Sequence, residues 1–205
     1  DTYGAGGELR IEEPRVRWDI IDAWRDAAAQ CGIPPVKVFN RGDNFGCAYF
    51  QVNQKRGRRW SATNAFLRPA LHRPNLTVMT HASVLKLNFE QKRCKGLDFV
   101  HRNERISVEA KRETILAAGA IGSPQLLQLS GIGPAPLLEK HGIPVLHDLK
   151  GVGENLHDHL QIRLQNKVKN VKTLNGIANS LWGKAAMAPE YFAWRTGPLT
   201  MPPSQ

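Results

Sequence analysis

Apolar residues at helical spacing predict one clear amphipathic helix near the start of the chain, over Asp19–Gln30. Gly32 and the two prolines that follow it predict where this helix ends. Its apolar face is formed by Ile20, Ile21, Trp24, Ala27 and Ala28. A glycine-rich loop comes next, and Ser61 then has the residue type of an N-cap for a second, short helix with the sequence SATNAFLRPAL.

From Asn75 onward the pattern changes to period two, which is typical of β-strands. The expected strands are Leu76–Leu87 (one long strand or a strand pair), Cys94–His101, Arg105–Ala110 and Glu113–Ala118. Several short strands with tight connections, followed by a strand that leads into a helix, predict an α/β (α+β) fold. In that fold a mixed sheet is covered by helices.

The last expected strand leads into the sequence AAGAIGSPQLLQLSGIG, Ala117 to Gly133, which predicts a glycine turn and then a helix. Ser123 is a suitable N-cap, Pro124 suits the first helical position, and Gly131 can close the helix as its C′ residue. Alanine and glycine at the turn allow another helix or a ligand to approach the backbone closely. A further short helix is expected over Ala135–Lys140.

The composition, with 41% hydrophobic and 22% charged residues among 205, is ordinary for a soluble globular protein. No run of about 18 apolar residues is present, which excludes a spanning helix. The first residues lack the basic start and apolar core of a secretory signal, and the missing initiator methionine predicts an upstream segment. The three cysteines show no CxxC spacing and favour a reducing compartment over a disulfide framework. We therefore expect a cytoplasmic protein.

The net charge of +10 has three interpretations. The densest basic patch, KRGRRW (Lys55 to Trp60), is compatible with a nucleic-acid surface. The other basic residues are scattered among acids, and no nucleic-acid fold motif is present, so a solvated basic face is favoured. A basic surface also suits an anionic cofactor or membrane headgroups, which extends the expected location to the membrane periphery.

No phosphate-binding fingerprint is found in the sequence. A dinucleotide fold needs GxGxxG between a strand and a helix, but neither Gly4–Gly7 nor Gly151–Gly153 supplies the third glycine, and no Walker A pattern exists. For a metal, His157 and His159 flank Asp158 and can share one side of a strand. A third ligand is missing, which favours a hydrogen-bonded loop over a metal site.

A covalent nucleophile is not supported either. Ser130 lies next to Gly131, but residue 128 is Gln and residue 132 is Ile, so the GxSxG frame of a nucleophile elbow is absent. Ser130 is interpreted as part of a helix end.

Several ordered segments together resemble one family. The stretch GAIGSPQLLQLSGIG resembles the second signature of the glucose-methanol-choline (GMC) oxidoreductases, flavoenzymes that include choline dehydrogenase and glucose oxidase. The other matching segments, in the order of the family, are GRRWSATNAFLRPAL, RPNLTVMTHASVLKL, GIPVLHDLKGVGENLHDHL and the late Gly197-Pro198-Leu199. The resemblance covers nearly the whole chain. His157 stands where the family commonly has Gln before Asp-His.

The resemblance implies part of an FAD-binding mixed-sheet domain interleaved with part of a substrate-binding domain. The implied division is 1–70 for a substrate-domain portion and helical connection, 71–150 for an FAD-domain portion, and 151–205 for the start of the substrate-binding portion. Val84 is implied to contact the adenine end of FAD through its backbone. Ala117, Ala118 and Gly119 are implied to form a turn against the cofactor. Close packing of helix and sheet is the alternative reason for small residues there.

Departures from the family pattern predict an internal fragment. The N-terminal GxGxxG unit and the C-terminal histidine region that supplies the catalytic base are absent, so no catalytic residue is assigned. We expect a choline dehydrogenase-like parent that oxidises a primary or secondary alcohol and passes electrons to oxygen or a membrane acceptor. We expect the fragment alone to be inactive and to need the rest of the parent chain. The alternatives are a non-catalytic binding module derived from that fold and a basic nucleic-acid binder.

Overall fold

The computed structural model describes residues 4–40 and 42–201, and these fall into two compact units. One unit takes the chain up to Thr77 and from Gln165 onward, and the other takes Val78–Leu164. The units divide the chain after Thr77 and after Leu164, whereas the expected divisions follow residues 70 and 150. The assignment of these parts to cofactor-binding and substrate-binding domains stays a prediction.

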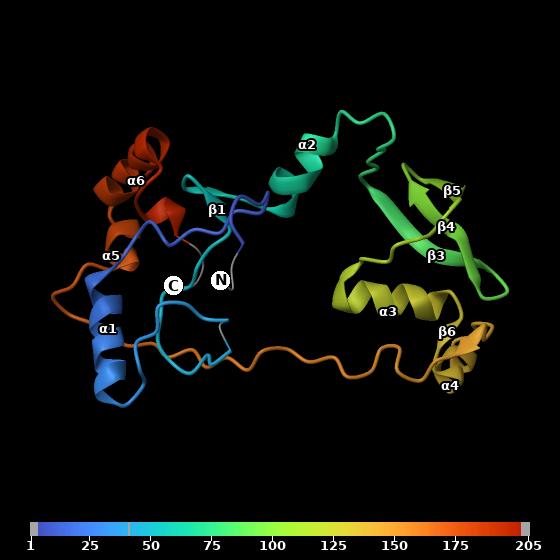
Figure 1. The fold of residues 1–205 in the computed structure, drawn as a ribbon, viewed down its shortest axis with the longest axis horizontal. Helices are drawn as coiled ribbons and strands as arrows, with labels where there is room; N and C mark the ends of the chain where they lie inside the picture. The colour runs from blue at the N-terminus through green and yellow to red at the C-terminus, as the bar shows by residue number, and fades with distance from the viewer. Residues whose placement is uncertain (1–3, 41, 202–205) are drawn as a thin grey trace. The chain divides into compact units, whose positions relative to one another are not determined.

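The first unit is mainly helical (Figure 1). Its elements are α1 (Asp19–Gln30), β1 (Gln54–Lys55), β2 (Arg58–Arg59), the π-helical turn η1 (Thr63–Leu67), α2 (Arg68–Ala70), α5 (Leu174–Ala178), α6 (Leu181–Trp194) and the 3₁₀ turn η2 (Pro198–Thr200). Helix α1 has the predicted bounds. Asp19 and Asp22 lie in its first turn, where acidic side chains complement the helix dipole. The second expected helix is present as η1 and α2, but its N-cap is Ala62 without a side-chain hydrogen bond, so the prediction that Ser61 caps it is wrong.

The basic patch KRGRRW forms a tight hairpin between β1 and β2. Arg56 and Gly57 have φ values of 52° and 73°, as a two-residue turn with both central residues in the left-handed region requires. The ammonium of Lys55 lies 4.5 Å from the Trp60 ring centroid, a cation–π contact. The basic residues of this patch thus have positions in the hairpin itself. Arg56 lies in the turn, Lys55 pairs with Arg58 across the ladder, and Lys55 contacts the Trp60 ring.

Thr200, near the end of the described chain, contacts this hairpin. Gln54, which is buried, donates from Nε2 to the carbonyl oxygen of Thr200 at 2.5 Å. The indole N–H of Trp18 lies 3.3 Å from the sulfur of Met201. These contacts join the N-terminal and C-terminal segments into one unit.

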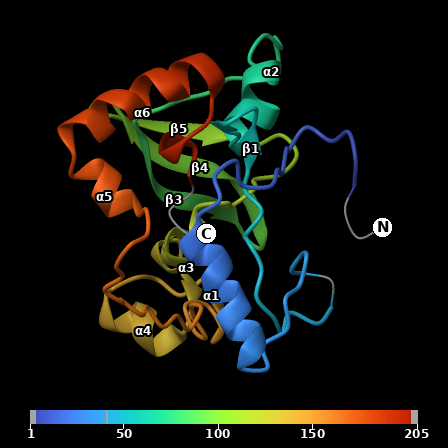
Figure 2. The ribbon, with the colours of Figure 1, turned by 90° about the vertical axis from the view of Figure 1, so that its left-hand side faces the viewer.

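The second unit contains a three-stranded sheet and two helices. Its elements are β3 (Ala82–Glu90), β4 (Arg93–His101), β5 (Glu104–Glu109), α3 (Gly119–Leu129), β6 (Ile132–Gly133), α4 (Ala135–Lys140) and β7 (His147–Asp148). The sheet is an antiparallel meander in the order β3-β4-β5, with Leu87 and Phe99 buried. Figure 1 and Figure 2 both show α3 on the β3 side of the sheet, and α3 contacts β3. The predicted class of helices combined with sheets is confirmed, although the parallel pair β6–β7 forms a sheet of its own.

Three further local predictions are wrong. The strand expected over Leu76–Leu87 begins only at Ala82, as β3, and residues 76–81 form no strand. Glu113–Ala118 is not a strand, because no strand of the described chain pairs with it, and Ile115 is 80% exposed. Helix α3 begins at Gly119 rather than after Ser123, so Pro124 lies inside the helix. The end was predicted correctly, since Gly131 follows the C-cap with φ 86°. Helix α4 also has the predicted bounds.

Candidate functional site: the turn before α3 and the edge strand β3

Val84 lies on an edge strand beside a β-bulge. It is half-buried and faces Phe99 of β4. The register shifts between Val84 and Lys86, so that Leu85 is an extra residue on β3. Within the described residues β3 pairs with β4 alone, which leaves its outer edge without a strand partner. Bulges commonly re-aim a strand next to functional sites, and an unpaired edge presents backbone groups to a neighbour.

The small-residue turn Ala117–Gly119 is exposed throughout. Gly119 has φ 86°, a conformation that favours glycine, and a Cβ placed on it would meet no atom within 4 Å. Close packing within this unit therefore does not account for Gly119. Its backbone conformation does, and the space beside it is open.

The start of α3 is held by a side chain from its own second turn. The hydroxyl of Ser123 accepts a hydrogen bond from the backbone N–H of Ala118 at 3.0 Å. Pro124 has no N–H, so the carbonyl of Ala120 lacks its usual helical partner. First-turn N–H groups of a helix likewise lack intrahelical acceptors. The turn and the start of α3 thus present small side chains and backbone polar groups at one place.

A cleft of about 640 Å³ lies between α3 and the loop that follows Lys150. Gln128 spans it, donating from Nε2 to the carbonyl of Val152 at 3.1 Å. Ile121 and Leu156 line it while remaining 73% and 67% exposed. The remaining lining residues are Ala120, Ser123, Pro124, Gln125, Leu127, Gly151, Gly153, Glu154 and Asn155.

The cleft was not predicted from the sequence, in which Gly151–Gly153 stands out only as an incomplete nucleotide fingerprint. Gly153 has φ 89°, and a Cβ there would lie 2.7 Å from Nε2 of Gln128. Two glycines followed by Asn155, which also has positive φ, were the available signal for a close approach to a helix.

A carboxylate links the three strands of the sheet that carries Val84. Asp98, largely buried on β4, accepts hydrogen bonds from Nδ2 of Asn88 at 2.7 Å and from Nη2 of Arg105 at 2.8 Å. The hydrogen bond from Asn88, followed by that from Arg105, holds the pKa of Asp98 well below its usual range. The ionised carboxylate therefore links all three strands.

The two histidines considered as metal ligands, His157 and His159, lie in an exposed loop. The backbone N–H of His159 donates to Oδ1 of Asp158 at 2.7 Å. Over residues 4–40 and 42–201, no three His, Cys, Asp or Glu side chains gather as a metal site would require. No helix in that same part of the chain is long and apolar enough to cross a membrane. The Ser130 hydroxyl makes hydrogen bonds with two backbone groups, the N–H of Leu87 and the carbonyl of Leu126.

The structure places the four expected cofactor residues in the same unit. Val84 lies on β3, and Ala117, Ala118 and Gly119 lie at the start of α3. These two elements contact each other. Whether these residues hold a cofactor stays a prediction.

Most of the chain is similar to known oxidoreductases. The family model for GMC oxidoreductase matches residues 5–161. An alcohol dehydrogenase [acceptor] from Pseudomonas putida is 37% identical over 180 residues, which is 87% of this chain and 32% of that protein. An oxygen-dependent choline dehydrogenase from Brucella anthropi is 37% identical over 194 residues, 95% of this chain and 35% of that protein.

The fold is also found among solved structures. An FAD-dependent oxidoreductase from Chaetomium thermophilum matches with a TM-score of 0.84 at 30% identity, covering 96% of this chain and 35% of that chain. The chain thus spans about a third of the length of the proteins that it matches.

Proposed function

Because this chain belongs to the GMC oxidoreductase family, we propose that it forms part of a flavoenzyme that oxidises an alcohol to a carbonyl compound. The substrate class is a choline-like or other primary or secondary alcohol, in line with the names of its relatives. The electrons leave to an acceptor, either oxygen or a membrane component. Bound FAD would supply the hydride acceptor for this reaction.

The observation that carries the cofactor assignment is the open turn at Gly119. Its positive φ favours glycine, and apart from its own neighbours and helix backbone no described residue lies within 4 Å of a Cβ placed there. Gly142 shares both features, so the assignment depends on where this turn lies, at the start of the helix that contacts β3. Such a turn admits a flat ligand against the backbone. We propose that Ala117, Ala118 and Gly119 pack against FAD, and that the backbone of Val84 on the unpaired edge of β3 contacts its adenine end.

The role of this chain is to bind and orient rather than to transfer protons. No residue is assigned as the catalytic base, so the base that takes the alcohol proton is proposed to lie elsewhere in the parent chain. On this proposal the 205 residues alone are inactive. The non-catalytic binding module and the nucleic-acid binder remain alternatives, and the hairpin geometry of KRGRRW gives the second of these no added support.

The rest of the parent chain is the proposed partner of α6. Four large apolar side chains of this helix are 70% exposed or more: Leu181, Trp182, Phe192 and Trp194. A helix that is hydrophobic on all sides belongs in a protein interior or a membrane. At 14 residues, α6 is about 21 Å long and too short to span a bilayer. It also lacks the strongly polar face of an interfacial helix. A cytoplasmic location with peripheral membrane contact remains a prediction.

The test is flavin retention by the full-length parent protein. After incubation with FAD and desalting, the wild-type protein is expected to show the visible flavin absorption band. Gly119→Val should lose it, because a branched side chain fills the open space and opposes positive φ. Gly142→Val is the matched control, since Gly142 also has positive φ and no atom within 4 Å of a Cβ. Equal flavin retention in both variants would contradict the assignment of the turn.

A further inference from the structure

We propose that Ser130 is a positioning residue, which fixes α3 against the edge of β3 and so sets the spacing between the Ala117–Gly119 turn and Val84. This inference rests on the proposed function, because the turn and Val84 are the two elements assigned to FAD. Ser130 itself touches neither the substrate nor the cofactor in this proposal.

The hydroxyl of Ser130 makes two hydrogen bonds with two different elements. It donates to the carbonyl oxygen of Leu126 in the last turn of α3 at 2.5 Å. It accepts from the backbone N–H of Leu87 on β3 at 2.8 Å. One oxygen atom thus connects the end of the helix with the middle of the strand.

The N–H of Leu87 depends on this contact. Leu87 is 7% exposed, and in the part of the chain described here β3 has a strand partner on one side only. A buried backbone donor without a hydrogen-bond partner is unfavourable. The hydroxyl of Ser130 therefore accepts a hydrogen bond from the Leu87 N–H, which has no partner within the sheet. The contact lies at one fixed position along β3.

This contact gives the helix a register that apolar packing alone does not give. Apolar surfaces attract each other without direction, whereas a hydrogen bond of 2.8 Å specifies one place along the strand. Figure 1 shows α3 and β3 running in the same general direction. Helix α3 runs without a break from Gly119 to Leu129, so a shift at its end is expected to reach Gly119 at its start, although Pro124 removes one helical hydrogen bond between them.

The position of Ser130 in the chain supports the same role. It is the C-cap of α3, and Gly131 follows with φ 86°. The carbonyl of Gly131 then accepts from the backbone N–H of Leu146 at 2.8 Å. The backbone after Ser130 is thus held in place, and the Ser130 hydroxyl lies between Leu126 and Leu87.

The test compares Ser130→Ala with Ser130→Thr in the full-length parent protein. Ser130→Ala is expected to weaken FAD binding about tenfold and to change the shape of the visible flavin band. Ser130→Thr keeps the hydroxyl and should restore affinity to within about twofold of the wild-type value. Ser180→Ala is the matched control, because it removes an N-cap hydroxyl of α6 in the other unit. It should leave FAD affinity unchanged.

A second measurement separates this inference from the proposed function. Amide hydrogen exchange at Leu87 without FAD should be faster in Ser130→Ala than in the wild-type protein, whether or not flavin binds. Unchanged exchange would overturn the inference while leaving the proposed function intact. Wild-type FAD affinity and spectrum in Ser130→Ala would also overturn it. A wild-type protein that binds no FAD would instead overturn the proposed function and, with it, any positioning for FAD.

Discussion

Asn88 on β3 donates a hydrogen bond of 2.7 Å to the carboxylate of Asp98 on β4, and this pair connects the strand that carries Val84 to the rest of the sheet. Arg105 on β5 contacts the other oxygen of the same carboxylate at 2.8 Å. The ionised form of Asp98 is therefore the form that the folded unit requires.

The first prediction concerns the pH dependence of this network. The pKa of Asp98 is lowered in the folded state, first by the hydrogen bond from Asn88, so the carboxylate contributes stability above its unfolded pKa of about 3.9. That contribution is lost as the pH falls toward the lowered folded pKa. Asp98→Asn should lower the free energy of unfolding at pH 7, and the difference from the wild-type protein should shrink below about pH 4. Denaturant unfolding at several pH values measures this.

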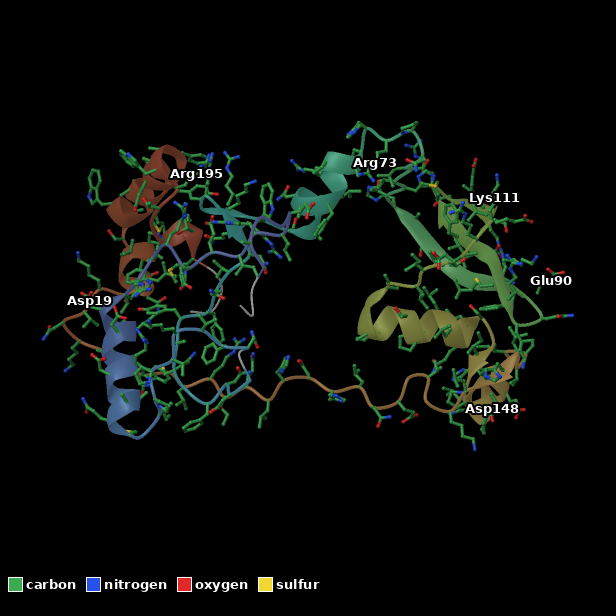
Figure 3. All side chains as sticks on the ribbon, viewed as in Figure 1. Asp19, Arg73, Glu90, Lys111, Asp148 and Arg195 are labelled. Carbon is green, nitrogen blue, oxygen red and sulfur yellow. The ribbon has the colours of Figure 1, made fainter. Side chains whose placement is uncertain are left out.

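Glu90 supplies the matched control for Asp98. Its pKa is also lowered, by a hydrogen bond and ion pair with Lys95, but its side chain is 70% exposed. Figure 3 shows Glu90 at the end of β3, where the chain turns into β4. Glu90→Gln should leave stability nearly unchanged, because exposed ion pairs contribute little. A larger loss in Glu90→Gln than in Asp98→Asn would contradict the role given to Asp98.

Elements set by local signals could be predicted from the sequence. Helix α1 has its apolar face, its acidic first turn and Gly32 within a short stretch, and its predicted bounds match the structure. The end of α3 is set by Gly131, a local requirement for positive φ. These features depend on residues within a few positions of each other.

Elements that depend on distant partners could not be predicted. Glu113–Ala118 has the composition of a strand, but a strand also needs a neighbour, and the described chain supplies none. Helix α6 has no clear apolar period because its apolar residues are spread around the helix, with Lys184 and Glu190 as its charged residues, and Pro189 in its interior argues against a helix. Figure 3 labels Arg195 just after this helix, where its left-handed conformation forms the C-cap. The hydrogen bond beside the cleft joins Gln128 to Val152, which are 24 positions apart. Gly151 and Gly153 indicate a close approach, but they do not tell which helix approaches.

The second prediction tests the steric role of Gly131. A Cβ at this position would lie 2.6 Å from the carbonyl oxygen of Pro144, in addition to requiring positive φ. Gly142 requires positive φ as well but has no atom within 4 Å of a Cβ. Gly142→Ala should therefore lower the free energy of unfolding by about 1 kcal/mol, and Gly131→Ala by about 3 kcal/mol. Equal losses in chemical unfolding would show that backbone conformation alone selects glycine at both sites.

The third prediction concerns Tyr49 in the first unit. Its hydroxyl donates to Oδ1 of Asp22 at 3.0 Å, and the guanidinium of Arg17 lies 4.9 Å from its ring centroid. Burial, followed by the hydrogen bond to Asp22, raises the pKa of Tyr49 above its ordinary value. A raised pKa means that the protonated phenol stabilises the fold below about pH 10 and that this contribution is lost as the pH rises through the folded pKa.

Tyr49→Phe separates the hydroxyl from the ring. The variant keeps the ring for Arg17 and should lose about 1 kcal/mol of stability at pH 7, the value of one hydrogen bond. Its stability should also decline less between pH 9 and pH 11 than that of the wild-type protein, as measured by denaturant unfolding at each pH. A parallel decline in both proteins would exclude Tyr49 as the titrating group.

The last prediction tests whether α6 is buried in the complete parent protein. Trp182 is 86% exposed in this unit, and substitutions of such surface residues usually change stability by less than about 0.5 kcal/mol. If the rest of the parent chain covers α6, Trp182→Ala should instead lower the free energy of unfolding of the complete protein by about 3 kcal/mol, because a buried indole is lost. Lys184→Ala on the same helix is the control and should have little effect. If Trp182→Ala and Lys184→Ala leave the complete protein equally stable, α6 remains a surface helix. Binding of that protein to anionic vesicles would then indicate a membrane as the partner of α6.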